Sequence, residues 1–217
     1  MIVSACWSAA SADIDWEAAT HRLAAENQAL AQRPQGHDGT YFVICTLYYT
    51  PMESGFTAER GFDVTPETRP GLKGRTYPRE FLQAIKKEGF GRLITAVNGL
   101  DYIRYEGEGL YGFAKHVTGR GGVLVPGFSA ATRRGQSHFR YGVELRIGGE
   151  AICEVFESED WKVMDTGGGL RRWHIDLYWG EDEPLGPGRL AARPKNTTFE
   201  FAFSEVQVKP SAGPKKE

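Results

Sequence analysis

A glycine-rich turn followed by a strictly alternating segment is the feature that most constrains the fold of this chain. The segment Asp165–Leu170 reads DTGGGL, and its three successive glycines allow a tight turn or a positive φ. From Arg172 to Trp179, polar and apolar residues then alternate in period two, as in a β-strand with one buried face. We therefore predict a turn followed by a strand over 172–179.

The two faces of this predicted strand carry different chemistry. One face holds side chains that can anchor in a core, namely Trp173, Ile175, Leu177 and Trp179. The other face holds Arg172, His174, Asp176 and Tyr178. A rigid strand that presents these polar groups side by side could build a reaction site. A solvated outer face of a sheet is the open alternative.

The size and charge of the chain suit one globular domain without affinity for polyanions. Its 217 residues are enough for one domain, with or without an insertion. The net charge is -2 and basic doublets such as Arg133-Arg134 are interpreted as solvated charge, so nucleic acid is not an expected partner. No run of about eighteen apolar residues occurs, so we expect no transmembrane segment.

The first twelve residues carry features of an export signal. They have no charged side chain and end in Ala10-Ser11-Ala12, a pattern typical of a signal peptidase site, while Val3–Cys6 is similar to a lipobox. We expect an exported protein, in the periplasm, at the outer membrane or outside the cell, with 1–12 as a signal remnant and lipidation at Cys6. A disordered terminus is the open alternative, because no basic n-region or full apolar h-region is present.

The cysteines give no sign of a disulfide framework or a metal centre. Three cysteines, at positions 6, 45 and 153, are too few for a framework, although a bridge between Cys45 and Cys153 stays open. No spacing of Cys and His indicates zinc. We expect neither a metal nor an organic cofactor.

Two helices and many short strands are expected along the chain. The first helix covers 15–32, within an N-terminal helix and linker over 13–40, and the second covers 78–88, with Pro78 at N1 and Gly89 at C′. The segment 52–74 is expected to be an irregular loop or hairpin, and 209–217 a disordered tail. Strands are expected at 41–49, 92–97, 101–105, 110–117, 122–126, 142–147, 150–156, 160–164, 172–179 and 198–206. This pattern predicts a mainly β fold in the form of a barrel.

Other catalytic motifs are incomplete or absent in the sequence. Asp165-Thr166-Gly167 has the signature of an aspartic protease, but that chemistry needs two carboxylates that share a proton, and the chain has one such triplet. No Gly-x-Ser-x-Gly elbow occurs, although a catalytic pair with one of the five histidines stays open. Gly119–Gly122 lacks a following Gly-Lys-Ser/Thr and is expected to be a hairpin turn.

Several segments resemble the three-aspartate (3D) domain shared by MltA-like lytic transglycosylases and stationary-phase survival (Sps) proteins. Asp165–Leu170 and Ile175–Gly180 are similar to its Asp-Thr-Gly-Gly-Ala-Ile … Asp-aromatic-Gly motif, with the two aspartates eleven positions apart. Thr46–Pro51 resembles the Tyr-Tyr-Thr-Pro strand that opens the domain, and Tyr141–Ile147 resembles its Leu-Gly-Thr-x-Leu-x-Ile strand.

The resemblance implies a double-psi β-barrel over 41–208, with an insertion at about 52–123 and a groove for the glycan strands of peptidoglycan. In the family pattern, Asp176 corresponds to the catalytic acid and Asp165 to a supporting carboxylate. Further side chains are expected to bind the substrate: Thr46, Tyr48, His174 and Tyr178. Tyr48 as a plain core tyrosine is the open alternative. One departure is that 134–140, where the family has its first aspartate, holds no acid. A catalytically weak or inactive glycan-binding barrel is therefore the second hypothesis.

The implied reaction is the cleavage of the β-1,4 bond between N-acetylmuramic acid and N-acetylglucosamine. Glycoside hydrolysis normally uses two carboxylates, whereas a lytic transglycosylase works with one, because the muramyl C6 hydroxyl attacks C1 of its own ring and gives a 1,6-anhydro product. Asp176 must start protonated, and an ionised Asp165 a few ångströms away would favour this state by repulsion. We expect a monomeric enzyme. A hydrolase that admits water is a third possibility.

Overall fold

The computed structural model describes residues 40–56, 66–148, 156, 160–171, 173–181 and 200–209. The chain forms two compact units. The first, here called the barrel unit, consists of Met1–Leu47, Gly119–Tyr178 and Thr198–Glu217, and the second, here called the insertion unit, consists of Tyr48–Thr118 and Trp179–Thr197. Several predictions fall outside the described residues, namely the signal remnant at 1–12, the first helix at 15–32, strand residues 150–155, the side chain of Arg172, and 210–217 of the tail.

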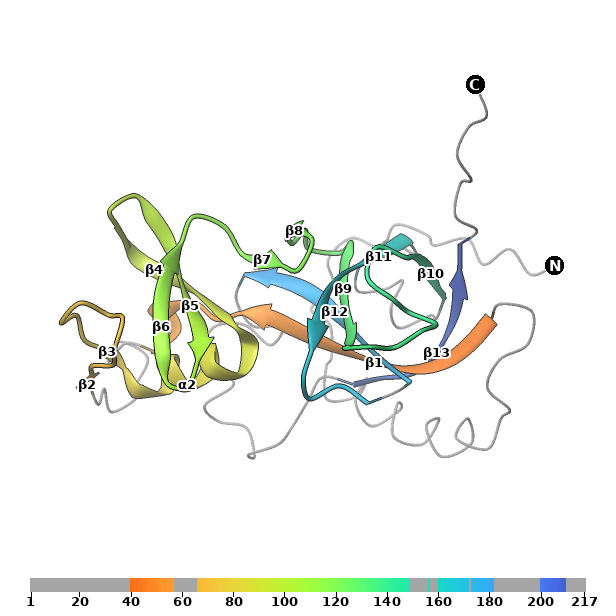
Figure 1. The fold of residues 1–217 in the computed structure, drawn as a ribbon, viewed down its shortest axis with the longest axis horizontal. Helices are drawn as coiled ribbons and strands as arrows, with labels where there is room; N and C mark the ends of the chain where they lie inside the picture. The colour runs from red at the N-terminus through yellow and green to blue at the C-terminus, as the bar shows by residue number, and fades with distance from the viewer. Residues whose placement is uncertain are drawn as a thin grey trace, which may run out of the picture. The chain divides into compact units, whose positions relative to one another are not determined.

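Six strands form a closed barrel in the order β1-β12-β9-β11-β10-β13 (Figure 1). Their bounds are Thr40–Thr50 for β1, Ser129–Arg133 for β9, Glu144–Gly148 for β10, Asp160–Gly167 for β11, His174–Glu181 for β12 and Glu200–Val208 for β13. The strands β9 and β11 are parallel, whereas β9 pairs antiparallel with β12. The prediction of a mainly β fold is confirmed.

Two of the four residues of the predicted apolar face, Ile175 and Leu177 of β12, pack into the core of the barrel, whereas Trp173 and Trp179 are only partly buried. Ile175 lies opposite Thr132 of β9, and Leu177 lies opposite Ala130. All four side chains are buried. The sequence did not predict β9, because its residues SAATR are small or polar and show no apolar alternation.

A β-bulge in β11 sets which face each of its residues occupies. Val163 pairs with Ala130 and Asp165 pairs with Ala131, so Met164 is the extra residue. Because neighbouring residues of β9 point to opposite faces, the bulge directs Val163 into the core and Asp165 to the other face. Without it, Val163 and Asp165 would share one face, and either a carboxyl would enter the core or a valine would leave it.

The insertion unit contains a helix and a three-stranded antiparallel sheet. The helix α2 spans Arg79–Glu88, and the sheet consists of β4 (Phe90–Val97), β5 (Leu100–Gly107) and β6 (Leu110–Ala114). Figure 1 shows α2 beside this sheet. The predicted helix is confirmed, except that Pro78 is its N-cap and not its N1 residue. The glycine at its C-terminal end is confirmed, since Gly89 has a φ of 93° and its N–H donates to the Ile85 carbonyl at 2.7 Å. The core of the unit consists of Phe56, Leu72, Tyr77, Phe81, Leu82, Ile85, Leu93, Ile103 and Tyr111.

The remaining elements are short. The 3-10 helix η1 spans Glu53–Phe56, and the strand pair β2–β3 covers Pro66–Glu67 and Tyr77–Pro78. The segment 52–74, expected to be irregular, thus contains η1 and β2. The pair β7–β8, Thr118–Gly119 and Gly122–Val123, confirms the hairpin predicted at Gly119–Gly122. Among the described residues, no helix has the length and apolar character needed to cross a membrane.

We expect Val163→Ala to destabilise the barrel unit by about 2 kcal/mol, because it removes two methyl groups from a side chain that is 0% exposed and leaves a cavity. Val125→Ala is the matched control, since Val125 belongs to the same unit and is 49% exposed. Urea unfolding of both variants measures the difference. Equal stabilities of the two variants would contradict the assignment of Val163 to the core.

Candidate active site

The two aspartates of the glycine-turn segment lie in one row across three strands. Asp165 of β11 and Asp176 of β12 both pair with Ala131 of β9, one from each side. Directly paired residues point to the same face, so both carboxyls project from the face opposite the buried Ile175. The backbones of Asp165 and Asp176 are two strand spacings apart, a distance of about 10 Å. The methyl group of Ala131, which is buried, is the only side chain between them in this row.

Thr46 of β1 extends this row on the other side of Asp176. Its hydroxyl donates to Asp176 Oδ1 at 2.6 Å. The same Oγ1 atom lies 2.6 Å from His174 Nε2. A hydroxyl has one proton, so when Thr46 donates to Asp176 it must accept from the Nε2–H of His174. The result is a directed chain from His174 through Thr46 to Asp176, which fixes the proton of the imidazole on Nε2.

Asp165 is held by backbone groups rather than by side chains. Its Oδ1 accepts hydrogen bonds from the N–H of Thr166 at 2.8 Å and of Arg120 at 3.4 Å. Burial raises the pKa of the Asp165 carboxyl above its ordinary value, and the two backbone hydrogen bonds lower the pKa by less than burial raises it. Asp165 is thus displaced toward its protonated form, whereas the sequence led us to expect an ionised neighbour only a few ångströms from Asp176.

The structure brings together some of the predicted site residues and places others in packed surroundings. Thr46, His174 and Asp176 form one hydrogen-bonded group, and Asp165 lies in the same row on the other side of Ala131 without a hydrogen bond to them. The side chains expected to line a groove through their rings are packed, since Tyr48 is 9% and Tyr178 is 3% exposed. For Tyr48 this burial fits the alternative of a core tyrosine.

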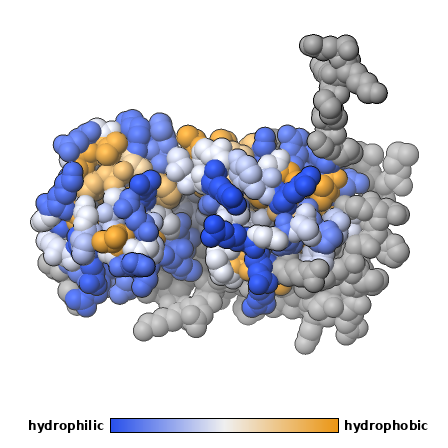
Figure 2. Space-filling view, in the orientation of Figure 1, coloured by the Kyte–Doolittle hydropathy of each residue, from blue (hydrophilic) through white to orange (hydrophobic). Residues whose placement is uncertain are grey.

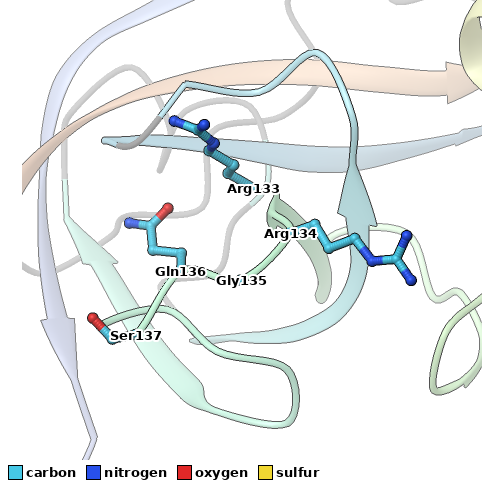
Figure 3. Close-up of a pocket in the computed structure, with 5 residues that line it drawn as sticks. All are labelled: Arg133, Arg134, Gly135, Gln136 and Ser137. Atoms are coloured by element: carbon cyan, nitrogen blue, oxygen red, sulfur yellow. The ribbon is translucent and has the colours of Figure 1, made fainter.

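The sequence did not identify a pocket at the end of β9. Arg133, Arg134, Gly135, Gln136 and Ser137 line a cavity of about 290 Å³ (Figure 3). The arginine doublet was interpreted as solvated charge, and the only signal nearby was the absence of an acid at 134–140. Within the described part of the chain, no group of three or more His, Cys, Asp or Glu residues is placed to hold a metal ion.

Solved structures with a similar fold are lytic transglycosylases. A membrane-bound lytic murein transglycosylase from Agrobacterium tumefaciens is 12% identical, with a TM-score of 0.52, and the match covers 88% of this chain and 84% of that one. E. coli MltA with bound chitohexaose is 15% identical, with a TM-score of 0.50, and the match covers 89% of this chain and 84% of that one. No protein-family model matches the chain, and neither does any curated protein.

At these identities the likeness concerns the fold alone. The fold of this chain is similar to that of MltA and related lytic transglycosylases, as the sequence motifs predict. The resemblance to Sps proteins and to the three-aspartate domain as such stays a prediction.

We expect Asp165→Asn to stabilise the protein at pH 7 and to lose this effect at pH 3. Because the folded-state pKa of Asp165 is raised, the folded protein binds more protons than the unfolded chain as pH rises above the ordinary value of 3.8, and the stability of the wild type falls in that range. Asparagine has no charge to desolvate and can still accept both backbone hydrogen bonds. Melting temperatures of both proteins at pH 3 and pH 7 provide the test.

Asp160→Asn is the control for this experiment, because it removes a carboxylate that is exposed at the start of the same strand and pairs with Lys209 at 2.6 Å. It should give no gain at pH 7. A difference between Asp165→Asn and wild type that is equal at both pH values would contradict the account of Asp165.

Proposed function

We propose that this protein is a peptidoglycan lytic transglycosylase that cleaves the β-1,4 bond between N-acetylmuramic acid and N-acetylglucosamine and forms a 1,6-anhydromuramyl product. The observation that carries the proposal is the hydrogen bond from Thr46 to Asp176, made on the polar face of a barrel whose fold is similar to that of lytic transglycosylases. That MltA has been crystallised with chitohexaose supports a β-1,4-linked glycan as the ligand.

Asp176 acts as the general acid in the first half of the reaction. The Thr46 hydroxyl occupies Oδ1, so the proton to be transferred resides on Oδ2 and goes to the glycosidic oxygen as the bond from C1 to that oxygen breaks. The chain from His174 through Thr46 holds the carboxyl in one orientation on a strand that is anchored by Ile175 and Leu177. A fixed orientation matters because proton transfer in the transition state needs the donor within hydrogen-bond reach of the leaving oxygen.

The same carboxylate then serves as the base. It accepts the proton of the muramyl C6 hydroxyl while the C6 oxygen forms a bond with C1 of the same ring, which restores the protonated acid without consuming water. The Thr46 hydroxyl stabilises the charged carboxylate between the two transfers. The backbone of Asp165 lies about 10 Å from that of Asp176, across Ala131. Asp165 is therefore a supporting carboxylate that does not share the proton of Asp176.

The proposed function agrees with a double-psi barrel, an exported protein and an insertion in the barrel. A barrel of the double-psi type is supported by the closed order of the six strands with the parallel pair β9–β11, and an exported protein is supported because the substrate lies in the cell envelope. An insertion at about 52–123 is supported by the segment Tyr48–Thr118, which forms one compact unit together with Trp179–Thr197.

A glycan-binding barrel without turnover is the second candidate. The observation that favours it is that 134–140 holds no acid and that two arginines, Arg133 and Arg134, line the pocket at this place instead. This candidate shares the glycan ligand and differs in having no reaction for Asp176 to catalyse.

We expect Asp176→Asn to reduce the rate at which the protein solubilises purified peptidoglycan by about 10³-fold, because an amide cannot donate and accept the proton in turn. Binding to sedimented peptidoglycan should stay within a few-fold of wild type, and Asp160→Asn should have wild-type rates. Turbidity loss and a pelleting assay measure the two properties. An Asp176→Asn variant with wild-type rates would contradict the role of Asp176, and binding without turnover by the wild type would favour the second candidate.

We expect Thr46→Val to reduce turnover by about 10- to 100-fold, since it removes a hydrogen bond to a charged group while it preserves the volume of the side chain. Thr46→Ser keeps the hydroxyl and should retain most of the activity. Initial rates on the same peptidoglycan, with melting temperatures to verify folding, compare the two variants. A loss in Thr46→Ser as large as that in Thr46→Val would contradict the role of the hydroxyl, because serine keeps it.

A further inference from the structure

A second polar row lies beside the row of the two aspartates. Arg133 follows Ala131 by two positions on β9, so its side chain projects from the same face, about 7 Å further along the strand. On one side it pairs with Gly167, which has no side chain to cover it. On the other side, the register in which Ile175 lies opposite Thr132 brings His174 opposite Arg133 when it continues by one residue.

The pocket that begins at Arg133 is held in shape by the barrel. The N–H of Gln136 donates to the Arg133 carbonyl at 3.2 Å, and Gly135 has a φ of 81°, which closes a tight turn that favours glycine. The Thr132 hydroxyl donates to the Phe139 carbonyl at 2.8 Å, and both residues are buried. The loop is therefore fixed at both ends by the barrel.

The donors in this pocket lack partners within the described part of the chain. Both polar atoms of the Gln136 side chain are buried without a hydrogen bond there. Arg133, which is exposed, makes no ion pair with any described residue. A buried amide without a partner is destabilising, and such groups in folded proteins call for an explanation such as a bound ligand.

Two of the side chains that line the pocket point to the same side of the turn. In Figure 3, the side chains of Arg133 and Gln136 extend to the same side of the turn, whereas that of Arg134 extends to the other. In Figure 2, strongly hydrophilic side chains gather over the part of the surface where β9 and β12 lie in Figure 1. Arg133 and Gln136 thus form the functional part of the pocket, with the Ser137 hydroxyl as a third lining donor.

We propose that this pocket binds a carboxylate of the peptide attached to the muramyl residue, and that it makes the protein selective for peptide-bearing glycan strands. A guanidinium with an amide and a hydroxyl matches the two oxygens of a carboxylate, and no acidic side chain lines the pocket to compete. A cavity of about 290 Å³ suits a short acidic group rather than a chain of sugar rings. In the glycan, only the muramyl residue carries such a group.

This inference rests on the proposed function, since it assigns the substrate group that lies next to Asp176. The backbone of Arg133 lies about 7 Å along β9 from Ala131, the residue that pairs with Asp176, so a group bound at Arg133 lies near the acid. The contact would select which sugar is bound at the acid, because N-acetylglucosamine offers no carboxylate. It would thereby align the muramyl side of the scissile bond with Asp176.

The test compares the affinities of two ligands for Arg133→Gln, for wild type and for Arg140→Gln. The ligands are a muramyl-tetrapeptide disaccharide and chitohexaose, and calorimetry measures both. Arg140 is a matched control because it is an exposed arginine further along the same loop that does not line the pocket. We expect Arg133→Gln to weaken the acidic ligand about tenfold or more and to leave chitohexaose unchanged, with Arg140→Gln close to wild type.

Gln136→Met is a second, independent variant, and its expected result differs from that of a folding defect. It replaces the buried amide with an apolar chain of similar shape, so we expect a higher melting temperature together with weaker binding of the acidic ligand. Unchanged selectivity in both variants, or equal weakening of both ligands, would overturn the proposal. If the wild type cleaves peptidoglycan and the variants keep its selectivity, only this inference is wrong. If the wild type does not cleave peptidoglycan, the proposed function is wrong.

Discussion

The pairing of β9 with β11 on one edge and β12 on the other is the constraint on which the site depends. This register places Asp165 and Asp176 on either side of Ala131, and it carries Arg133 on the same face two residues later. The bulge at Met164 is part of the same constraint, because it lets Val163 stay in the core while Asp165 faces away from it. A shift of one residue in either pairing would send one of the carboxyls into the core.

The two carboxyls have different surroundings, which supports different roles for them. Asp176 accepts a hydrogen bond from a side-chain hydroxyl that is itself oriented by His174, whereas Asp165 is buried and bound by backbone N–H groups. Different surroundings give two acids in one site different pKa values, and the two acids can then have different functions. A single working acid suits a reaction in which the substrate supplies its own nucleophile, and the carboxylate contact proposed for Arg133 would orient that substrate.

Local sequence patterns predicted those parts of the structure that local rules determine. Period-two alternation identified β12 and the burial of Ile175 and Leu177, and Gly89 marked the end of α2. The burial of Tyr178 on the other face departs from the alternation. The strand β9 was missed because small residues such as Ala131 are buried through their neighbours and not through an apolar pattern of their own. The bulge at Met164, the burial of Asp165 and the unpaired amide of Gln136 depend on residues distant in sequence, so no local pattern reveals them.

The mass of the soluble products that the wild-type protein releases from purified peptidoglycan tests the central claim most directly. The account predicts muropeptides that end in a 1,6-anhydromuramyl residue, lighter by one water molecule than hydrolysis products and without a reducing end. Products of full mass with a reducing end would show that water is the nucleophile. Such a result would contradict a single-acid transglycosylase built on Thr46 and Asp176.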